Sequence, residues 1–130
     1  MANGSISAEP MAVQSSPQRP EGQLATDTIT MEGRSGAKYQ FQVFPWGTDF
    51  KPLGAVYSVL KHRTDGRYDV IYIGQTRDLS ERFDDHHQAA CFTRNGKTHI
   101  GVQLESSEQR RLAIEQDLIA NYNPPCNKQK

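Results

Sequence analysis

Two apolar runs joined by a short polar turn constrain the fold of this chain more than any other feature. The runs, at residues 53–60 and 68–73, are rich in the β-branched and aromatic side chains that strands favour. Between them lies Asp65-Gly66, a pair that is typical of tight hairpin turns. We therefore predict that the two runs pair as antiparallel strands.

Three further segments are predicted to be strands. Residues 28–31 and 38–44 are β-prone and are separated by a glycine-containing turn at 32–36, so they favour a second hairpin. Residues 98–104 have the same character. After the first hairpin, Trp46 lies in a strand-breaking segment, where its ring either packs on the core or is exposed for a nucleobase to stack on.

Two segments have helical character. Thr76 can cap a helix on which Leu79 and Phe83 are helically spaced, and this helix is predicted to continue to about residue 88. A second helix begins with the capping-box spacing Ser-x-x-Gln at 106–109 and reaches residue 121, before the stop signal Asn-Pro-Pro. The order of elements predicts an α+β (mixed α/β) fold, with a small three-stranded antiparallel sheet flanked by helices and an extra N-terminal β-hairpin.

The first 27 residues differ in composition from the rest. They are rich in Ser, Pro, Gln, Gly and Ala and contain Pro10, Pro17 and Pro20 but few large apolar residues. We predict a disordered tail at 1–27 and one domain at 28–130, with its core at 53–127, because a chain of 130 residues has the size of a single domain.

The charge of the chain limits its function. Fifteen basic and fifteen acidic residues cancel, which argues against a protein that coats nucleic acid through a strong positive field. An enzyme needs only a local basic patch, and Lys61, Arg63 and Arg77 are candidate substrate-binding residues in such a patch.

Cysteine content and hydropathy favour a cytoplasmic protein. Cys91 and Cys126 have no metal-binding spacing, and two thiols do not make a disulfide framework, so a reducing compartment is expected. No apolar run approaches the roughly 20 residues that span a bilayer, and no secretory signal is visible. We expect a monomer without a membrane partner.

Polar side chains interrupt several of the apolar elements. Tyr57 and Tyr72 lie in the apolar strands, and Arg82 lies on the first predicted helix. On the last helix, Glu115 falls on the same predicted face as Leu112 and Ile119. A half-buried carboxylate needs a cation, which is either Arg82 in an ion pair or a bound divalent metal.

The same residues carry a resemblance to a known family. Gly54-Ala55-Val56-Tyr57 resembles the GIY element of the GIY-YIG nucleases, and residues 72–74 are identical to their YIG element. The remaining family positions follow in order as Arg82, His86, Glu115 and Asn127. The likeness covers residues 53–127, and its last part is similar to the catalytic domain of the excision-repair nuclease subunit. The chain departs from the family pattern in an inserted alanine and in a longer connection between the tyrosines.

The resemblance implies a divalent-metal-dependent endonuclease acting on DNA, with Tyr57, Tyr72, Arg82, His86 and Glu115 as catalytic residues. Glu115 would hold Mg²⁺ or Mn²⁺, and Arg82 would bind the scissile phosphate. Tyr57 would take the proton of the attacking water, with Tyr72 as a hydrogen-bond donor and His86 as a proton acceptor. Gly74 and Asn127 are expected to belong to the substrate-binding residues. Gly74 allows a close approach to the backbone, and Asn127 anchors the C-terminal segment against the site. His87 is expected to point elsewhere on the helix.

Two other classes of function remain open. One is a noncatalytic nucleic-acid-binding module with the same fold, and the other is an interaction protein whose tail at 1–27 binds a partner. For the nuclease, the sequence offers no recognition domain, so we expect cleavage directed by DNA structure or by a targeting protein, as in repair or recombination.

Overall fold

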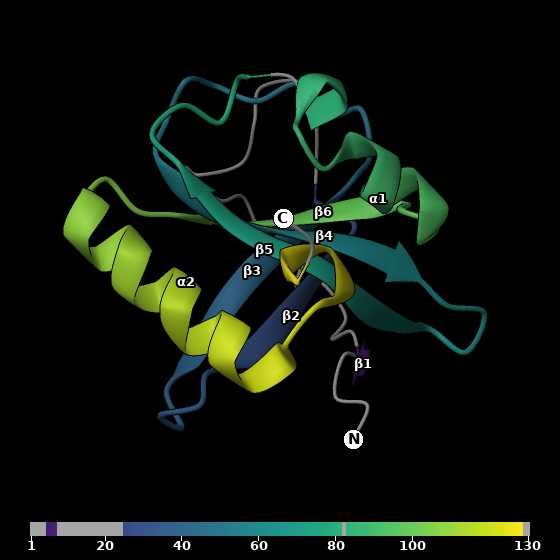
Figure 1. Ribbon diagram of the computed structural model, residues 1–130, viewed down its shortest axis with the longest axis horizontal. Coiled ribbons are helices and arrows are strands. Elements are labelled where there is room, and N and C mark those ends of the chain that lie inside the picture. Colours follow the sequence, from purple (N-terminus) through teal and green to yellow (C-terminus); the bar gives the residue numbers. More distant parts are fainter. Residues whose placement is uncertain (1–4, 8–24, 82, 129–130) are drawn as a thin grey trace.

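The computed structural model describes residues 5–7, 25–81 and 83–128. Its described strands form one six-stranded antiparallel sheet in the order β1-β5-β4-β6-β3-β2 (Figure 1). The strands are β1 (Ser5–Ser7), β2 (Asp27–Glu32), β3 (Lys38–Pro45), β4 (Ala55–His62), β5 (Arg67–Thr76) and β6 (His99–Leu104). Two α-helices and two short 3₁₀ helices accompany them, namely η1 (Phe83–Asp85), α1 (Ala89–Arg94), α2 (Glu108–Tyr122) and η2 (Pro125–Asn127).

The sheet is larger than the sequence predicted. Each strand expected from the sequence forms, but a three-stranded sheet with a separate hairpin is wrong. Strand β3 pairs with β6, with Gln42 opposite Val102, so the hairpin β2–β3 extends the same sheet. Local patterns identify hairpins, whereas this pairing joins strands far apart in the chain, and its register depends on tertiary packing.

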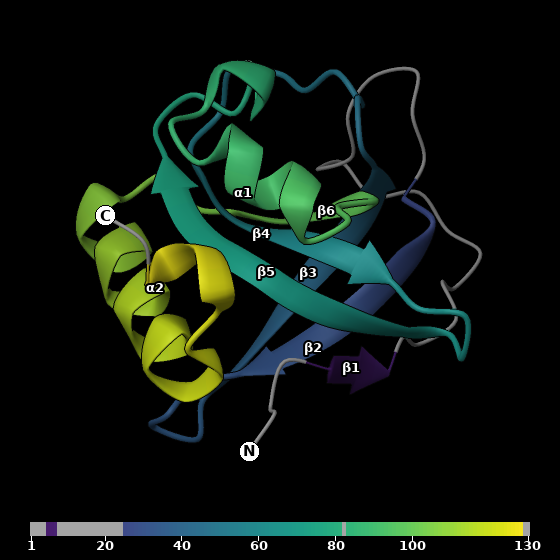
Figure 2. The same ribbon diagram turned by 45° about the vertical axis from the view of Figure 1, so that its right-hand side comes forward.

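Side chains alternate between two apolar layers, one on each face of the sheet. On one face, Val56 and Ile73 pack with Ile114 and Leu118 of α2. On the other face, Tyr57 and neighbouring strand residues pack with α1 and η2. Figures 1 and 2 show α1 and α2 on opposite sides of β5, with η2 beside that strand. Strand β5 therefore lies where both layers and the C-terminal segment meet.

The helix predicted from Thr76 to about residue 88 is wrong. Strand β5 continues to Thr76, and α1 begins only at Ala89. The Asp78 carboxylate accepts from the backbone N of Ser80 at 2.9 Å, and Thr76 Oγ1 accepts from the backbone N of Asp78 at 3.0 Å. These local side-chain bonds satisfy the backbone in a turn and compete with a helix. Arg82, the predicted phosphate-binding residue, lies outside the described residues.

Helix α2 forms at the predicted place, with a small shift. Its N-cap is Ser107 rather than Ser106, and the Ser107 hydroxyl accepts from the backbone N of Arg110 at 3.2 Å. At the other end Asn123 adopts a left-handed conformation with φ 48°, which ends the helix. The predicted inward face is rotated, because Leu112 is exposed while the buried residues are Arg111, Ile114, Leu118 and Tyr122.

The N-terminal segment is described only in part. Ser5–Ser7 pair with Arg67, Tyr68 and Asp69 of β5, and Asp27 belongs to β2, so these residues differ from the predicted disordered tail. The parts of that prediction at residues 1–4 and 8–24 lie outside the described residues.

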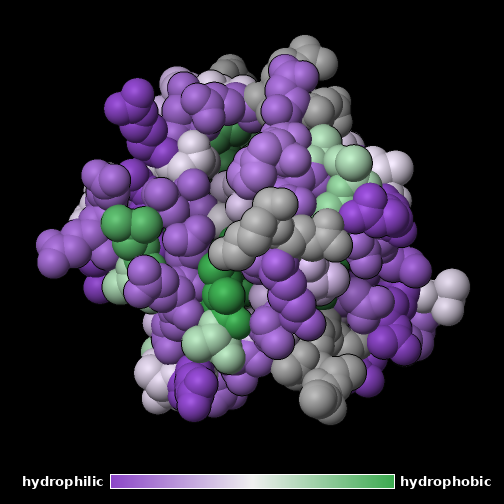
Figure 3. All heavy atoms as spheres, viewed as in Figure 1, coloured by the Kyte–Doolittle hydropathy of each residue, from purple (hydrophilic) through white to green (hydrophobic). Residues whose placement is uncertain are grey.

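The viewed surface is mostly hydrophilic. Figure 3 shows hydrophobic residues only in small separate areas, some of them over α2. Among the described residues, no helix combines the length and the apolar character needed to span a bilayer.

Candidate active site

The side chain of Tyr57 forms the centre of the candidate site. Its strand, β4, lies between β5 and β6, and the ring is buried. The Tyr57 hydroxyl lies 3.0 Å from Nε2 of His86, which follows η1. Phe83 packs edge-on against the Tyr57 ring, with the centroids 4.9 Å apart. The structure therefore brings together two residues that the sequence placed 29 positions apart.

Gly74 makes the room that the two tyrosines occupy. It lies opposite Tyr57 in the β4–β5 register. A Cβ atom at this position would lie 2.7 Å from the Tyr57 hydroxyl oxygen and 2.9 Å from the Tyr72 ring. Close approach at Gly74 was expected for substrate, whereas the groups that the structure brings close to it are these two rings.

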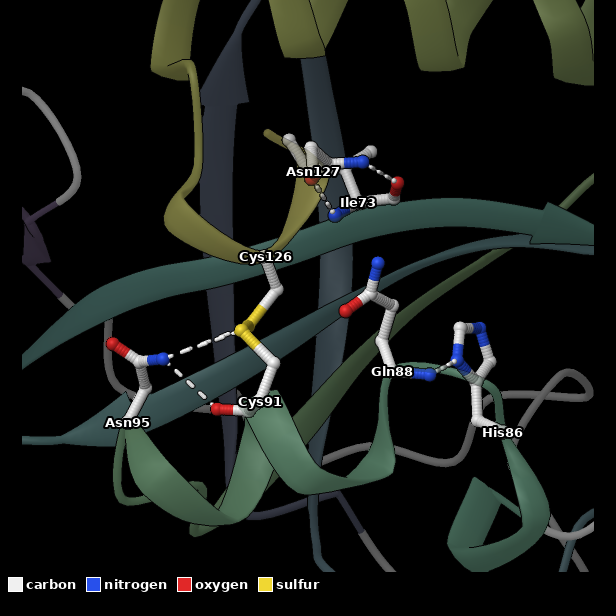
Figure 4. Close-up of a disulfide and its surroundings, with 7 residues drawn as sticks. All are labelled: Ile73, His86, Gln88, Cys91, Asn95, Cys126 and Asn127. Carbon is white, nitrogen blue, oxygen red and sulfur yellow. Dashed lines mark hydrogen bonds between the residues drawn. A yellow bond between two sulfur atoms is a disulfide. The ribbon is translucent and has the colours of Figure 1, made fainter. Parts of the chain in front are cut away.

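The hydrogen bonds of His86 define the role of its ring. The backbone N–H of Gln88 donates to His86 Nδ1 at 2.9 Å (Figure 4). In the neutral ring the proton must then lie on Nε2, which donates to the Tyr57 hydroxyl oxygen. Burial and the neighbouring His87 lower the pKa of His86 to about 4, so the ring is neutral at pH 7. From the sequence we expected His86 to be a proton acceptor, whereas this geometry makes it a donor.

Both tyrosines are held in the neutral form. Burial is the main cause that raises the pKa of Tyr57 well above its ordinary value, followed by repulsion from a Tyr72 phenolate and from the Glu115 carboxylate. Burial and the charge of Glu115 also raise the pKa of Tyr72. A phenol in this state is a poor base at pH 7, so Tyr57 needs added positive charge to lose its proton.

Glu115 is half-buried on α2, as the sequence predicted. Burial raises the pKa of its carboxyl, and among the described residues no side chain or backbone group pairs with it. Its charge raises the pKa of Tyr57 and of Tyr72, so the carboxylate lies within electrostatic range of both hydroxyl groups. A half-buried carboxylate with no partner among the described residues is suited to a hard cation such as Mg²⁺ or Mn²⁺.

The described residues offer few other ligands for such a cation. Among them, no three His, Cys, Asp or Glu side chains are grouped so that they could hold a metal ion. Mg²⁺ is commonly bound by one or two carboxylates and otherwise by water and phosphate oxygens. Glu115 therefore fits a cation that shares its coordination with the substrate, and does not fit a closed structural site.

The Tyr57 and His86 side chains face an open pocket. The His87 ring stacks on His86 with the centroids 4.3 Å apart, so the expectation that His87 points elsewhere is wrong, because no α-helix forms at this position. The rest of the lining includes three carboxylates and is formed by Thr76, Asp78, Glu81, Phe83 and Asp85. The pocket walls are thus acidic, and a phosphate entering it requires compensating positive charge.

Asn127 anchors the C-terminal segment to the site, as the sequence predicted. Its side-chain amide donates to the carbonyl of Ile73 at 2.9 Å and accepts from the backbone N of Ile73 at 2.8 Å (Figure 4). These are the two bonds that a neighbouring strand would make. Asn127 therefore holds the edge of β5 between Tyr72 and Gly74.

The two cysteines form a disulfide, which differs from the separate thiols expected from the sequence. The bond joins Cys91 of α1 to Cys126 of η2, with Cα atoms 5.9 Å apart, and Asn95 donates to the Cys91 carbonyl at 2.8 Å (Figure 4). Sequence spacing could not reveal this pairing, because packing of α1 and η2 on the same face of the sheet brings the cysteines together. The disulfide connects the segment that follows His86 to the segment that carries Asn127.

Of the predicted basic residues Lys61, Arg63 and Arg77, Arg77 alone lies beside the site. Arg63 makes ion pairs with Asp65 and Asp69 in the β4–β5 hairpin, six residues from Tyr57, which is roughly 20 Å along a strand. Lys61 is exposed on the same end of β4. Arg77 is exposed between Thr76 and Asp78, two residues that line the pocket.

Two supporting residues were missed by the sequence reasoning. The backbone of Gln88 fixes the His86 ring, and nothing in the side-chain pattern predicts such a contact. Arg111 is buried, where its Nε donates to Gln75 Oε1 at 2.9 Å and its guanidinium also donates to the carbonyls of Glu105 and Ser106. Its position on α2, one turn before Glu115, was the available signal for an inward-facing arginine.

Comparison of the chain with known protein families, curated proteins and solved structures gives no match. The resemblance to GIY-YIG nucleases therefore rests on the residues of this chain and on their arrangement.

Proposed function

We propose that this protein is a divalent-metal-dependent endonuclease that hydrolyses DNA phosphodiester bonds. The observation that carries the proposal is the contact of Tyr57 with His86 and Tyr72, with the half-buried Glu115 within electrostatic range of both tyrosines. These residues come from β4, β5, the turn after η1 and α2, yet Tyr57 bonds His86 and both tyrosines respond to the charge of Glu115. Hydrolysis needs a proton acceptor, a donor that orients it and a site for a cation, and these residues supply one of each.

In this mechanism Tyr57 accepts the proton of the attacking water. Tyr57 must first lose its own proton to water in the open pocket, and His86 Nε2–H is placed to donate to the phenolate oxygen that this leaves. Mg²⁺ or Mn²⁺ held by Glu115 would supply the positive charge that lowers the pKa of Tyr57 and offsets charge on the phosphate. Tyr72, whose ring centroid lies 5.1 Å from that of His86, would donate a hydrogen bond to water or phosphate.

The basic residues divide into two roles. Arg82 stays the predicted phosphate-binding residue, because a guanidinium offers forked donors and keeps its charge, but it lies outside the described residues. Arg77 at the pocket rim is the described arginine suited to a flanking phosphate. Lys61 and Arg63, at the far end of β4, would contact only a more distant part of the DNA.

The substrate is proposed to be recognised by its structure or through a targeting protein. The net charge of zero provides no strong general attraction to DNA. A cytoplasmic location and a monomeric state stay predictions, and the Cys91–Cys126 disulfide weighs against a reducing compartment.

A noncatalytic nucleic-acid-binding module is the second candidate. The carboxylates of Asp78, Glu81 and Asp85 count against catalysis at this pocket, because they repel the scissile phosphate when no cation is bound, and a noncatalytic module would bind nucleic acid elsewhere on its surface. The raised pKa of Tyr57 also counts against catalysis, because it keeps the proposed proton acceptor protonated at pH 7.

Cleavage assays separate the two candidates. Single-stranded, duplex, flap and junction DNA are incubated with the wild type, Glu115→Gln and Glu108→Gln in Mg²⁺ or Mn²⁺. Glu108 lies on the same helix and is exposed, so Glu108→Gln controls for loss of a charge. We expect cleavage by the wild type and Glu108→Gln, and at least a 100-fold loss in Glu115→Gln, an effect of the size that losing a key electrostatic group has. Binding of these DNAs without cleavage by any of the three proteins would instead support the second candidate.

A further inference from the structure

A second pocket adjoins the candidate active site and has no part in the proposed chemistry. It is lined by the aromatic side chains of Trp46, Phe50 and Phe83, by Leu79 and Ile100, and by polar residues that include Thr48, Asp49, Ser80 and Glu81. The space is about 140 Å³. In another protein an apolar cavity of about 150 Å³ binds a single benzene molecule. The size and the lining of this pocket therefore suit one planar ring.

The pocket lies beside the active-site pocket. Phe83 and Glu81 line both. The Phe83 ring centroid lies 4.9 Å from that of Tyr57 and 5.9 Å from that of Trp46. The Phe83 ring therefore contacts the central tyrosine of one pocket and the tryptophan of the other. A planar group bound here would thus belong to the molecule whose reacting bond lies at Tyr57.

Trp46 is held in place by a tight turn at the end of β3. The Pro45 carbonyl accepts from the backbone N of Thr48 at 3.2 Å, and Gly47 has a φ of 95°, which favours glycine. The backbone N of Trp46 also donates to the Thr98 carbonyl at 3.0 Å. The backbone of Trp46 is thus fixed, and its indole ring packs on Phe83 and Phe92, with centroids 5.9 and 6.0 Å apart, which reduces the entropy cost of stacking on it.

The charges around the pocket distinguish a base from a phosphate. The carboxylates of Asp49 and Glu81 line it, and they repel phosphate but accept hydrogen bonds from the amino groups of bases. Lys97 Nζ lies 5.1 Å from the centroid of the Trp46 ring, where its charge favours a phosphate attached to the bound base. The carboxylates therefore suit the base of a nucleotide, and the Lys97 ammonium group suits its phosphate.

We infer that this pocket binds an unpaired nucleobase next to the scissile phosphodiester, which rests on the proposed nuclease function. The base would stack on Trp46 and contact Phe50 and Phe83 at its edges. Aromatic stacking of this kind tolerates different bases, because every base has a π face. The pocket therefore selects unpaired DNA, such as a flap, a junction or a single strand, over an intact duplex.

Fluorescence of Trp46 tests the inference directly, because the chain contains one tryptophan. The wild type in EDTA is titrated with a single-stranded oligonucleotide and with an abasic oligonucleotide of the same length and charge. We expect the first to quench Trp46 and to bind about tenfold more tightly than the second, the change that loss of one stacked base produces. Equal quenching and equal affinity for the two oligonucleotides would overturn the inference.

Variants separate the pocket from the rest of the surface. Phe50→Ala and Phe50→Leu are expected to weaken binding of the base-containing oligonucleotide about tenfold, and Phe50→Leu keeps most of the apolar volume if Phe50→Ala does not fold. Leu53→Ala, at an exposed residue outside the pocket, should bind like the wild type. Unchanged affinity in a folded Phe50 variant would contradict the inference.

Cleavage distinguishes failure of this inference from failure of the proposed function. If Mg²⁺ supports cleavage but a substrate with an abasic site beside the cut is cleaved at the normal rate, the base pocket is wrong and the nuclease stands. If base-dependent quenching occurs and no DNA is cleaved, the pocket stands and the nuclease is wrong.

Discussion

Nε2 of His86 lies 3.0 Å from the Tyr57 hydroxyl oxygen, and the backbone N–H of Gln88 occupies the other ring nitrogen. The neutral ring therefore donates to Tyr57 and cannot take its proton without breaking the bond from Gln88. This arrangement stabilises a phenolate at Tyr57 once a cation lowers its pKa. Because the two side chains have different roles, variants of Tyr57 and of His86 should have different effects on cleavage and stability.

Removal of the Tyr57 hydroxyl should abolish cleavage with little effect on folding. Tyr57→Phe keeps the buried ring but loses the proton acceptor, so we expect cleavage in Mg²⁺ to fall about 100-fold or more. Unfolding in urea should show a loss of only about 1 kcal/mol, for one hydrogen bond. Tyr122→Phe is the matched control, because its hydroxyl accepts from the backbone N of Glu32 far from the site. Equal activity in the two variants would exclude Tyr57 as the proton acceptor.

Protonation of His86 should destabilise the fold in mild acid. The folded pKa of about 4 lies below the ordinary value of 6.5, so the unfolded chain binds more protons between these values. The stabilisation is complete above pH 6.5 and is lost as the pH falls towards 4. We expect the free energy of unfolding to fall by about 1–2 kcal/mol from this group, allowing for solvent screening of a half-exposed ring.

Urea unfolding at pH 4.5 and 7 measures this effect. His86→Gln should show a smaller difference between the two pH values than the wild type. His99, whose pKa burial also lowers, contributes separately, and His99→Gln provides the comparison. A His86→Gln variant with the full wild-type pH dependence would contradict the assignment.

A methyl group at Gly74 should disturb both tyrosines. Gly74→Ala places Cβ 2.7 Å from the Tyr57 hydroxyl oxygen, and overpacking of this kind costs about 1–3 kcal/mol. Gly101→Ala is a matched strand control, because its Cβ would come no nearer than 3.4 Å to a neighbour. We expect Gly74→Ala to lower both the thermal midpoint and cleavage, with a smaller effect for Gly101→Ala. Similar losses of stability and cleavage in the two variants would show that the contacts of Gly74 with the tyrosines are not important for the site.

The disulfide should stabilise the segments that support the site. Cys91→Ser removes the link between α1 and η2, and loss of a native disulfide typically costs about 2–4 kcal/mol. Thermal unfolding with and without reductant should show that reduced wild type resembles Cys91→Ser. The variant itself should not respond to reductant, and an equal response of both proteins would rule out the bond as the cause. Asn127→Ala, which removes the two bonds to Ile73 but keeps the disulfide, separates the two anchors.

The amino-acid sequence alone determined most elements and the type of residue at the site. The apolar runs of β4 and β5, the end of α2 at Asn123 and the half-buried Glu115 follow from patterns within a few residues, because side-chain periodicity and backbone preference act locally. The helix expected from Thr76 does not form, because hydrogen bonds from the Thr76 and Asp78 side chains to the backbone stabilise a turn over the same few residues.

Only the tertiary structure decided which of these elements meet. The β3–β6 pairing, the Cys91–Cys126 bond and the contact between Tyr57 and His86 join residues that no local pattern connects. Each depends on burial of both faces of one twisted sheet, which fixes strand order and brings η1, α1 and η2 to the same side as Tyr57. The GIY-YIG-like positions were readable in the chain, whereas the direction of the proton between Tyr57 and His86 was set by the backbone of Gln88.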